Sequence, residues 1–262
     1  MIILITTLVI AVIGAVVGTG LVITGKKFHV EVDERETAVR EKLPGNNCGG
    51  CGFAGCDALA AAIVAGKAPV NACPVGGTPA AEEIGKIMGV AAGEIERKAA
   101  FVHCKGSCDV TRNQGTYVGI HDCRSAALAG IPITDCDYGC LGLGTCAQAC
   151  PEHAITIRNG VAVVNRNKCV ACGLCVKNCP RGLIELTPVK KHVYVQCMNR
   201  DKGPTVKKVC SAGCIGCSLC SRVCESGALE FSGSLARINP ELCTECGKCA
   251  EKCPAKVITR LP

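Results

Sequence analysis

The sequence contains no tryptophan, and only three tyrosines and four phenylalanines stand among its 262 residues. Large aromatic side chains normally supply much of a protein core, so this chain lacks the usual means of packing one. It also lacks the glycine-rich phosphate loops and the nucleophile motif that indicate dinucleotide, nucleotide or hydrolase chemistry. Disulfides or metal must therefore help to stabilise the chain. No substrate chemistry is expected on the chain itself.

Cysteine is abundant instead, with 25 residues, alongside 31 glycines. A small secreted protein would use them as disulfides, but the count is odd and the cysteines fall in tight, regular runs. Zinc sites pair C-x2-C knuckles, often with histidine, and the five histidines here show no ligand spacing. Runs of C-x2-C-x2-C followed by C-P are typical of 4Fe–4S clusters. The pattern favours iron–sulfur clusters and a reducing, cytoplasmic compartment.

Residues 2–23 carry no charge and are apolar except for three threonines. About 20 such residues can cross a bilayer as a helix. A cleaved signal peptide would need a basic segment before its apolar run, and none precedes this one. We therefore expect a single-pass anchor over residues 1–25 in the cell membrane. The positive-inside rule places the iron–sulfur domains on the cytoplasmic side, because basic residues follow the span: Lys26, Lys27, Arg35, Arg40 and Lys42.

Four cysteines after the anchor predict a first 4Fe–4S cluster in a small helical domain. With its polar tether this domain covers residues 26–100. Three of the cysteines lie in the segment NNCGGCGFAGC, and the fourth precedes a proline. Helices are expected over residues 57–65 and from Thr78 onward. The four candidate ligands are Cys48, Cys51, Cys56 and Cys73.

The remainder of the chain is a repeat. One constant shift along the sequence, which places Cys136 on Cys210, superimposes nine pairs of cysteines without a gap. It predicts two ferredoxin-like units, over residues 101–188 and 189–262. Each unit carries a hairpin between its two cysteine motifs, one turning at Asn159-Gly160 and the other around Gly233. Two motifs that flank a hairpin are the layout of a two-cluster ferredoxin. The expected fold class is α+β: a transmembrane helix, a small helical iron–sulfur domain and two tandem ferredoxin-like units.

In two-cluster ferredoxins the fourth cysteine of each motif ligates the other cluster. This rule predicts two clusters in the second unit and one of the two in the first. The second unit would use Cys214, Cys217, Cys220 and Cys253 for one cluster and Cys224, Cys243, Cys246 and Cys249 for the other. The first unit would use Cys150, Cys169, Cys172 and Cys175.

One motif, DCDYGCLGLGTCAQACP, departs from the pattern, because Leu143 stands where the other copy has Cys217. Cys136 lies four residues before Cys140 and is expected to act as the substitute. The fourth ferredoxin-type cluster would then use Cys136, Cys140, Cys146 and Cys179, for a total of five clusters. Some cysteines remain: Cys104, Cys108 and Cys123 are candidate ligands of a sixth cluster or else thiols beside one, and Cys197 and Cys210 have no assigned role.

The formal net charge of +7 treats every cysteine as neutral. A cluster held by four thiolates carries about −2 when oxidised, so five clusters would bring the total to about −3. The charge therefore gives no argument for nucleic acid. Residues 181–208 have a local excess of positive charge, which suits docking of an acidic ferredoxin, although a solvated linker is the alternative. Its basic residues are Arg181, Lys190, Lys191, Arg200, Lys202, Lys207 and Lys208.

Three features together resemble the B subunit of the Rnf complex, a membrane-bound ferredoxin:NAD oxidoreductase coupled to ion transport. They are the uncharged N-terminal helix, CGGCGFAGC with Cys73-Pro74, and CDYGCLGLGTCAQACP. Two repeats resemble the longer family members, and Glu225 departs from the pattern, which has proline after the last cysteine of the motif. The resemblance implies an electron-transfer subunit of a translocase that takes electrons from reduced ferredoxin. It would pass them to other membrane and flavin-carrying subunits.

The competing interpretation is a membrane-tethered polyferredoxin that serves another redox enzyme, such as a hydrogenase or a reductase. Such a protein would share the clusters but would not need the NNCGGCGFAGC domain, whose presence favours the Rnf family.

Overall fold

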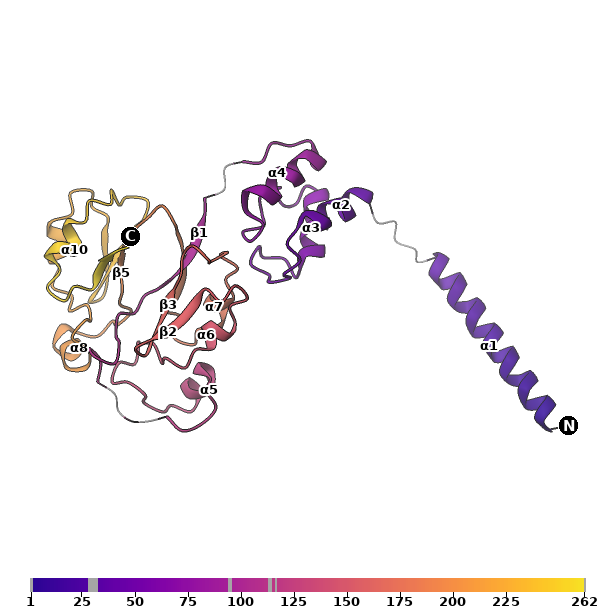
Figure 1. Ribbon diagram of the computed structural model, residues 1–262, viewed down its shortest axis with the longest axis horizontal. Helices are drawn as coiled ribbons and strands as arrows, with labels where there is room; N and C mark the ends of the chain where they lie inside the picture. Colours follow the sequence, from indigo (N-terminus) through magenta and orange to yellow (C-terminus); the bar gives the residue numbers. More distant parts are fainter. Residues whose placement is uncertain (1, 28–32, 94–95, 113–114, 116, 262) are drawn as a thin grey trace.

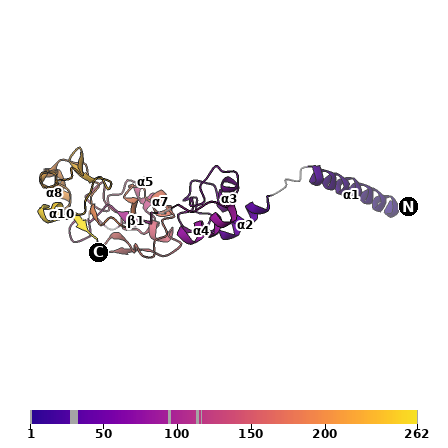
Figure 2. The same ribbon diagram turned by 90° about the horizontal axis from the view of Figure 1, so that it is seen from above.

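The computed structural model describes residues 2–27, 33–93, 96–112, 115 and 117–261. Residues 28–32, which belong to the expected tether, lie outside the described residues. Along the chain, a single long helix is followed by a helical unit and then by two β-containing units that lie together (Figures 1 and 2).

Helix α1 spans Ile2–Lys27 and confirms the helix expected at the N-terminus. Its segment Ile5–Thr24 is long and apolar enough to cross a membrane, and none of that segment is buried in the structure. The hydroxyl of Thr19 donates a hydrogen bond to the carbonyl of Ala15 at 2.5 Å, and that of Thr24 to the carbonyl of Gly20 at 2.7 Å. Such bonds within the helix allow threonine to enter an apolar environment without an unpaired polar group.

The helical unit packs α2 (Glu34–Lys42), α3 (Cys56–Val64) and α4 (Gly77–Met88) around one small core. Val39, Leu59, Ile63 and Ile84 are almost completely buried there. Leu59 and Ile63 are four positions apart, so they share one face of α3. Both helices expected in this region are confirmed.

The first and second units each contain two antiparallel pairs of strands and three short helices, which is an α+β arrangement. In the first unit the strands are β1 (Lys98–Val102) with β4 (Ile184–Pro188) and β2 (Ile155–Arg158) with β3 (Val161–Val164). Its helices are α5 (Cys123–Leu128), α6 (Thr145–Gln148) and α7 (Leu174–Asn178).

The second unit repeats this plan. It pairs β5 (Val193–Val195) with β8 (Ile258–Arg260) and β6 (Leu229–Ser232) with β7 (Leu235–Ile238). Its helices are α8 (Gly203–Val209), α9 (Leu219–Arg222) and α10 (Lys248–Lys252). The inner strand pairs confirm both predicted hairpins. Asn159 and Gly160 both have positive φ, at 48° and 77°, as the tight hairpin turn requires.

The outer strand of each unit, β1 or β5, is not anticipated by the sequence pattern. The expected domain boundary after residue 100 falls inside β1, which pairs with β4 from Lys98 to Val102. The structure therefore moves the start of the first unit back to Lys98. No local pattern signals this pairing, because β1 and β4 lie at opposite ends of the unit in the sequence, with both cysteine motifs between them.

The two units meet along β1 and β5. Phe101 and Tyr194 stack there with ring centroids 4.5 Å apart, so two of the few aromatic residues lie at this junction. His103 is buried, with Nδ1 2.9 Å from the carbonyl oxygen of Val195 and Nε2 3.0 Å from a carboxylate oxygen of Glu185. The contact with Val195 connects the first unit to β5 of the second, and the contact with Glu185 lies within the first unit.

The helical unit contacts the first unit through a cysteine-bearing loop. A Cβ atom added at Gly50 would lie 2.6 Å from the carbonyl oxygen of Cys172, so the two backbones touch and only glycine fits. Nearby, the ammonium group of Lys177 donates a hydrogen bond to the carbonyl of Gly49 at 3.4 Å. In Figures 1 and 2 the helical unit accordingly lies beside α7.

Candidate iron–sulfur sites

All 25 cysteines are free thiols. We assign 24 of them to six groups of four, of which three line common cavities and three follow the motif spacing. Among the described residues, no three or more His, Cys, Asp or Glu side chains converge at the spacing of a single metal ion. We number five of the groups as sites, and a sixth, at the junction of the two units, is called the junction group. Site 1 is Cys48, Cys51, Cys56 and Cys73; site 2 is Cys150, Cys169, Cys172 and Cys175; site 3 is Cys123, Cys140, Cys146 and Cys179; site 4 is Cys214, Cys217, Cys220 and Cys253; site 5 is Cys224, Cys243, Cys246 and Cys249; the junction group is Cys104, Cys136, Cys197 and Cys210.

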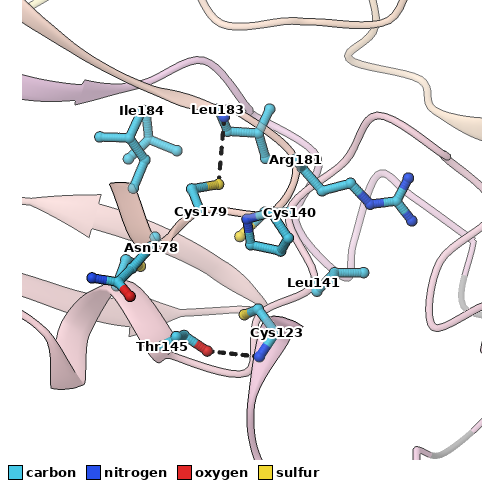
Figure 3. A pocket seen from close by; sticks show the side chains of 13 residues that line it. Cys123, Cys140, Leu141, Thr145, Asn178, Cys179, Arg181, Leu183 and Ile184 are labelled. Atoms are coloured by element: carbon cyan, nitrogen blue, oxygen red, sulfur yellow. Dashed lines mark hydrogen bonds between the residues drawn. The ribbon is translucent and has the colours of Figure 1, made fainter. Parts of the chain in front are cut away.

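Sites 3 and 4 are equivalent cavities in the two units. The four cysteines of site 3 line a cavity of about 20 Å³, and those of site 4 line one of the same volume. In Figure 3 the labelled sulfur atoms of Cys123, Cys140 and Cys179 lie along the same space. In each site the last cysteine comes from the other motif of the unit, Cys179 in site 3 and Cys253 in site 4. This crossing is the arrangement of a two-cluster ferredoxin.

The structure corrects one member of the expected site 3. Cys136 does not line this cavity, and Cys123 does. Cys123 is the first residue of α5, whose N-cap Asp122 accepts a hydrogen bond from the amide of Ser125 at 2.8 Å. The hydroxyl of Thr145 in α6 accepts a hydrogen bond from the Cys123 amide at 2.6 Å (Figure 3) and donates one to Asp122 at 2.9 Å. Thr145 thus fixes the start of α5 beside Cys146.

A difference in loop length explains the substitution. Cys136 follows Cys104 by 32 positions, whereas Cys210 follows Cys197 by 13, so the first unit has 19 extra positions there. The extra segment carries α5 and Cys123. The first unit therefore has Leu143 where the second unit has Cys217, and its fourth cysteine comes from an inserted helix instead.

The same comparison changes the alignment of the two repeats. Cys104 and Cys197 each lie two residues after the outer strand of their unit, β1 or β5. Cys104 and Cys197 are therefore the equivalent pair. The constant shift along the sequence instead pairs Cys123 with Cys197. An ungapped comparison cannot detect an equivalence that the insertion interrupts.

Sites 2 and 5 are the other equivalent pair. Burial is the main reason that the pKa of Cys175 is raised to about 12. The neighbouring thiols of site 2, and Cys146 of site 3, raise it further. Burial, followed by the thiol of Cys243 and then those of Cys246 and Cys224, likewise raises the pKa of Cys249. In site 1, burial raises the pKa of Cys73, and the neighbouring thiols of Cys51 and Cys56 add to this effect. Backbone hydrogen bonds lower the pKa but do not outweigh the rise. Deprotonation of several thiols in so small a space would need a compensating cation, which iron would supply.

Backbone amides point at the sulfur atoms of several sites. The amide of Gly76 donates to Cys73 in site 1 at 3.3 Å, and that of Ala154 donates to Cys150 in site 2 at 3.3 Å. The amide of Ala100 in β1 donates to Cys169 at 3.3 Å, and that of Leu183 donates to Cys179 at 3.4 Å. A hydrogen bond to a thiolate is charge-assisted, and such bonds help to set the reduction potential of a cluster. The donor sets therefore fit anionic, cluster-bound sulfur.

Glycine is required where the cysteine loops contact the hairpins. Gly142 and Gly216, related by the repeat, have positive φ at 71° and 68°. An added Cβ would lie 2.6 Å from the carbonyl oxygen of Gly160 and 2.8 Å from that of Ser234, respectively. These close approaches hold the first cysteine of each motif against its hairpin turn.

The junction group collects Cys104 and Cys136 of the first unit with Cys197 and Cys210 of the second. The sixth set expected from the sequence is therefore not brought together: Cys123 belongs to site 3, and Cys108 lies exposed at the turn near Gly160. Cys197 and Cys210 have no role in the sequence pattern because their neighbours come from another unit.

The basic residues of the segment 181–208 do not form one surface. Lys190 and Lys191 lie in the turn between β4 and β5, and Lys191 donates a hydrogen bond to the carbonyl of Cys243 in site 5 at 2.9 Å. Lys207 and Lys208 lie in the last turn of α8. In Figure 1, α8 is at the lower end of the second unit, away from the end of β4 that pairs with the start of β1. The expected basic face is therefore divided between two places.

Three matches to family models cover most of the cysteine motifs. Residues 43–75 match a family described as "Putative Fe-S cluster". Residues 134–183 and 213–257 match the family "4Fe-4S dicluster domain", and residues 168–228 match a second family of the same description. These matches favour 4Fe–4S clusters over zinc.

Curated relatives align with nearly the whole chain. The B subunit of the Na(+)-translocating ferredoxin:NAD(+) oxidoreductase complex of Acetobacterium woodii is 45% identical over 96% of this chain and 76% of its own length. The B subunit of an ion-translocating oxidoreductase complex of Methanosarcina acetivorans is 42% identical over 95% of both chains. The B subunit of the proton-translocating ferredoxin:NAD(+) oxidoreductase complex of Clostridium ljungdahlii is 38% identical over 95% of this chain and 89% of its own length.

Proposed function

This chain belongs to the family of B subunits of the Rnf complex, the ion-translocating ferredoxin:NAD oxidoreductases, and from that premise we propose how its sites serve the complex. It is the iron–sulfur electron-transfer subunit of such a complex. The alternative, a polyferredoxin for an unrelated hydrogenase or reductase, is not favoured, because the relatives match over both the helical unit and the two repeats.

Sites 1 to 5 each hold one 4Fe–4S cluster in this proposal, with Cys123 in the place first expected for Cys136. The support is the four cysteines that line each cavity of sites 3 and 4, the neighbouring thiols at the other sites and the amide donors directed at several of the sulfur atoms. When bound, the clusters would accept and release single electrons. The protein holds the sulfur ligands, shields most of them at least partly from water and supplies the hydrogen bonds that adjust their charge.

The sites follow one another through direct contacts. Site 1 meets site 2 where Gly50 touches the carbonyl of Cys172. Site 2 and site 3 share the first unit, and sites 4 and 5 share the second. We place site 5 in the second unit, which lies beyond the first unit from the helical unit (Figure 1), and site 1 in the unit nearest the membrane anchor. Electrons would therefore enter the second unit and leave through the helical unit towards partner subunits.

Reduced ferredoxin is proposed to dock beside site 5. Lys191 contacts the backbone of Cys243, and Lys190 next to it is exposed, so positive charge lies close to the terminal site. Cys246 of that site is itself exposed. Weak redox encounters depend on such charge steering, which raises the association rate and decreases with salt.

Helix α1 is proposed to anchor the chain in the membrane as a single span, with sites 1 to 5 on the cytoplasmic side. The apolar stretch Ile5–Thr24 supports the span. The basic residues that follow it in the sequence support the orientation. This arrangement would keep site 1 close to partners in the membrane.

The observation that carries the proposal is the arrangement of site 5, and Cys249→Ala tests it in the purified complex. Cys249 is buried within site 5, so its loss should abolish most ferredoxin-dependent reduction of NAD. Oxidation of NADH by an artificial acceptor, which would use the partner subunits alone, should persist and serves as the control. An unchanged ferredoxin-dependent rate would show that electrons do not enter through this site.

A further inference from the structure

The junction group is built as a ligand set, although neither the family matches nor the repeat pattern assigns it one. Its four cysteines are only 8–9% exposed. They line a cavity of about 20 Å³, the same volume as the cavities of site 3 and site 4. We propose that Cys104, Cys136, Cys197 and Cys210 hold a sixth 4Fe–4S cluster, which joins the two ferredoxin-like units. The proposal rests on the electron-transfer function proposed above.

Each unit contributes the same two positions to the junction group. Cys104 and Cys197 each lie two residues beyond the outer strand of their unit. Cys136 and Cys210 each lie four residues before the first cysteine of the next motif, Cys140 or Cys214. The site therefore has the internal symmetry of the repeat. A chance cluster of thiols at an interface has no reason to repeat both positions.

The hydrogen bonds to the sulfur atoms repeat as well. The sulfur of Cys104 accepts from the amide of Gly106 at 3.4 Å and from that of Cys140 at 3.5 Å. The sulfur of Cys197 accepts from the amide of Asn199 at 3.4 Å and from that of Cys214 at 3.4 Å. The same pairs of amides thus face the same sulfur in both units, as expected for thiolates rather than for neutral thiols.

The remaining two sulfur atoms receive side-chain donors from the opposite unit. Asn199 of the second unit directs its amide nitrogen to Cys136 at 3.6 Å, and Thr111 of the first unit directs its hydroxyl to Cys210 at 3.6 Å. Asn199 is only 2% exposed and Thr111 only 6%. Every sulfur atom of the group therefore has at least one donor, and two of these donors cross the junction.

A close contact also preserves the cavity. A Cβ at Gly106 would lie 2.7 Å from the hydroxyl oxygen of Thr111, whose position is fixed by a β-bridge to Cys210. Thr111 and the glycine together keep the backbone close to the sulfur atoms without filling the space between them.

The consequence is a continuous series of sites. Cys140 belongs to site 3 and donates its amide to Cys104, while Cys214 belongs to site 4 and donates its amide to Cys197. The junction cluster would thus be separated from each neighbouring site by one hydrogen bond. Cysteines of the junction group and of site 4 would hold clusters that exchange single electrons, so a transfer between them would require no bond to form or break.

The test uses the full-length chain purified without oxygen, in which Cys197→Ser is combined with Cys210→Ser. Iron and sulfide per chain should each fall by about four, the content of one 4Fe–4S cluster, while the EPR signals of the other clusters persist. Cys108→Ser is the matched control, because Cys108 lies outside all six groups, and it should lose no iron. Unchanged iron in the double variant, or the loss of about one zinc per chain instead of iron, would overturn the proposal.

Should the double variant fail to accumulate, Thr111→Val tests the same site with little change in shape. Removal of the hydroxyl donor to Cys210 should shift the midpoint potential of one cluster to a more negative value, because the hydrogen bond favours the more negative, reduced state. No shift in any potential would contradict the assignment. If the wild-type chain contains only five clusters and still accepts electrons from ferredoxin, the junction cluster is refuted and the proposed function is not.

Discussion

Replacement of Cys123 with alanine should deprive site 3 of one of its four ligands. Cys123 is buried and lines the same space as Cys140, Cys146 and Cys179. The loss of one thiolate leaves either a three-iron cluster or none, so iron per chain should fall by about one to about four. Iron analysis of the anaerobically purified chain, with EPR to detect a three-iron centre, measures the change.

The rescue by a second substitution makes this prediction specific. Leu143 occupies the position of Cys217 in the repeat and packs in the small cluster that contains Cys123. Leu143→Cys should therefore restore a complete cluster, and the lost iron, in the Cys123→Ala chain. The same substitution should restore nothing in a Cys136→Ala chain, because Cys136 lies in the junction group. The reverse pattern, rescue of Cys136→Ala alone, would refute the assignment of Cys123.

Three further outcomes are expected. Thr145→Val removes the acceptor for the Cys123 amide, a hydrogen bond worth about 1 kcal/mol. A chelator should then extract iron from site 3 severalfold faster than from the wild-type chain. An unchanged extraction rate would show that Thr145 does not position α5. Deletion of residues 1–25 should give a soluble chain with its iron content intact, because the sites lie outside α1. Iron is measured after purification without detergent, and an iron-free aggregate would contradict the boundary of the anchor at residue 25. Lys190→Glu should slow electron uptake from reduced ferredoxin about two- to fourfold at low salt, with the difference vanishing near physiological salt as screening increases. Lys208→Glu makes the same charge change in α8, away from site 5, and should have little effect; equal effects would place the docking surface elsewhere.

The elements that can be predicted from the sequence are those signalled by neighbouring residues. The Asn159-Gly160 turn fixes a hairpin because both residues adopt positive φ, and the apolar residues of α3 fall on one face. The motif spacing predicts the four cysteines that line the cavity of site 4, and the cysteine sets of sites 1, 2 and 5 stay predictions of that spacing. In each case the information lies within a short segment or within a repeat without gaps.

The elements that cannot be predicted depend on contacts between distant segments. Strand β1 pairs with β4 across the whole length of the first unit, and Cys104 meets Cys197 only because the two units pack along Phe101 and Tyr194. Proximity in sequence to Cys140 wrongly suggests that Cys136 shares its site. In the structure, the backbone between them turns Cys136 towards the second unit, and the inserted helix α5 supplies Cys123 instead.

Uptake of single electrons from reduced ferredoxin into 4Fe–4S clusters is the property on which the proposed function depends. It can be measured by mixing the anaerobically purified full-length chain with reduced ferredoxin and following, by rapid-freeze EPR, the appearance of reduced cluster signals. We expect reduced 4Fe–4S signals from several clusters, and we expect Cys249→Ala to delay or abolish them. A chain that contains zinc instead of iron, or whose clusters remain oxidised in the presence of excess reduced ferredoxin, would contradict the proposed function.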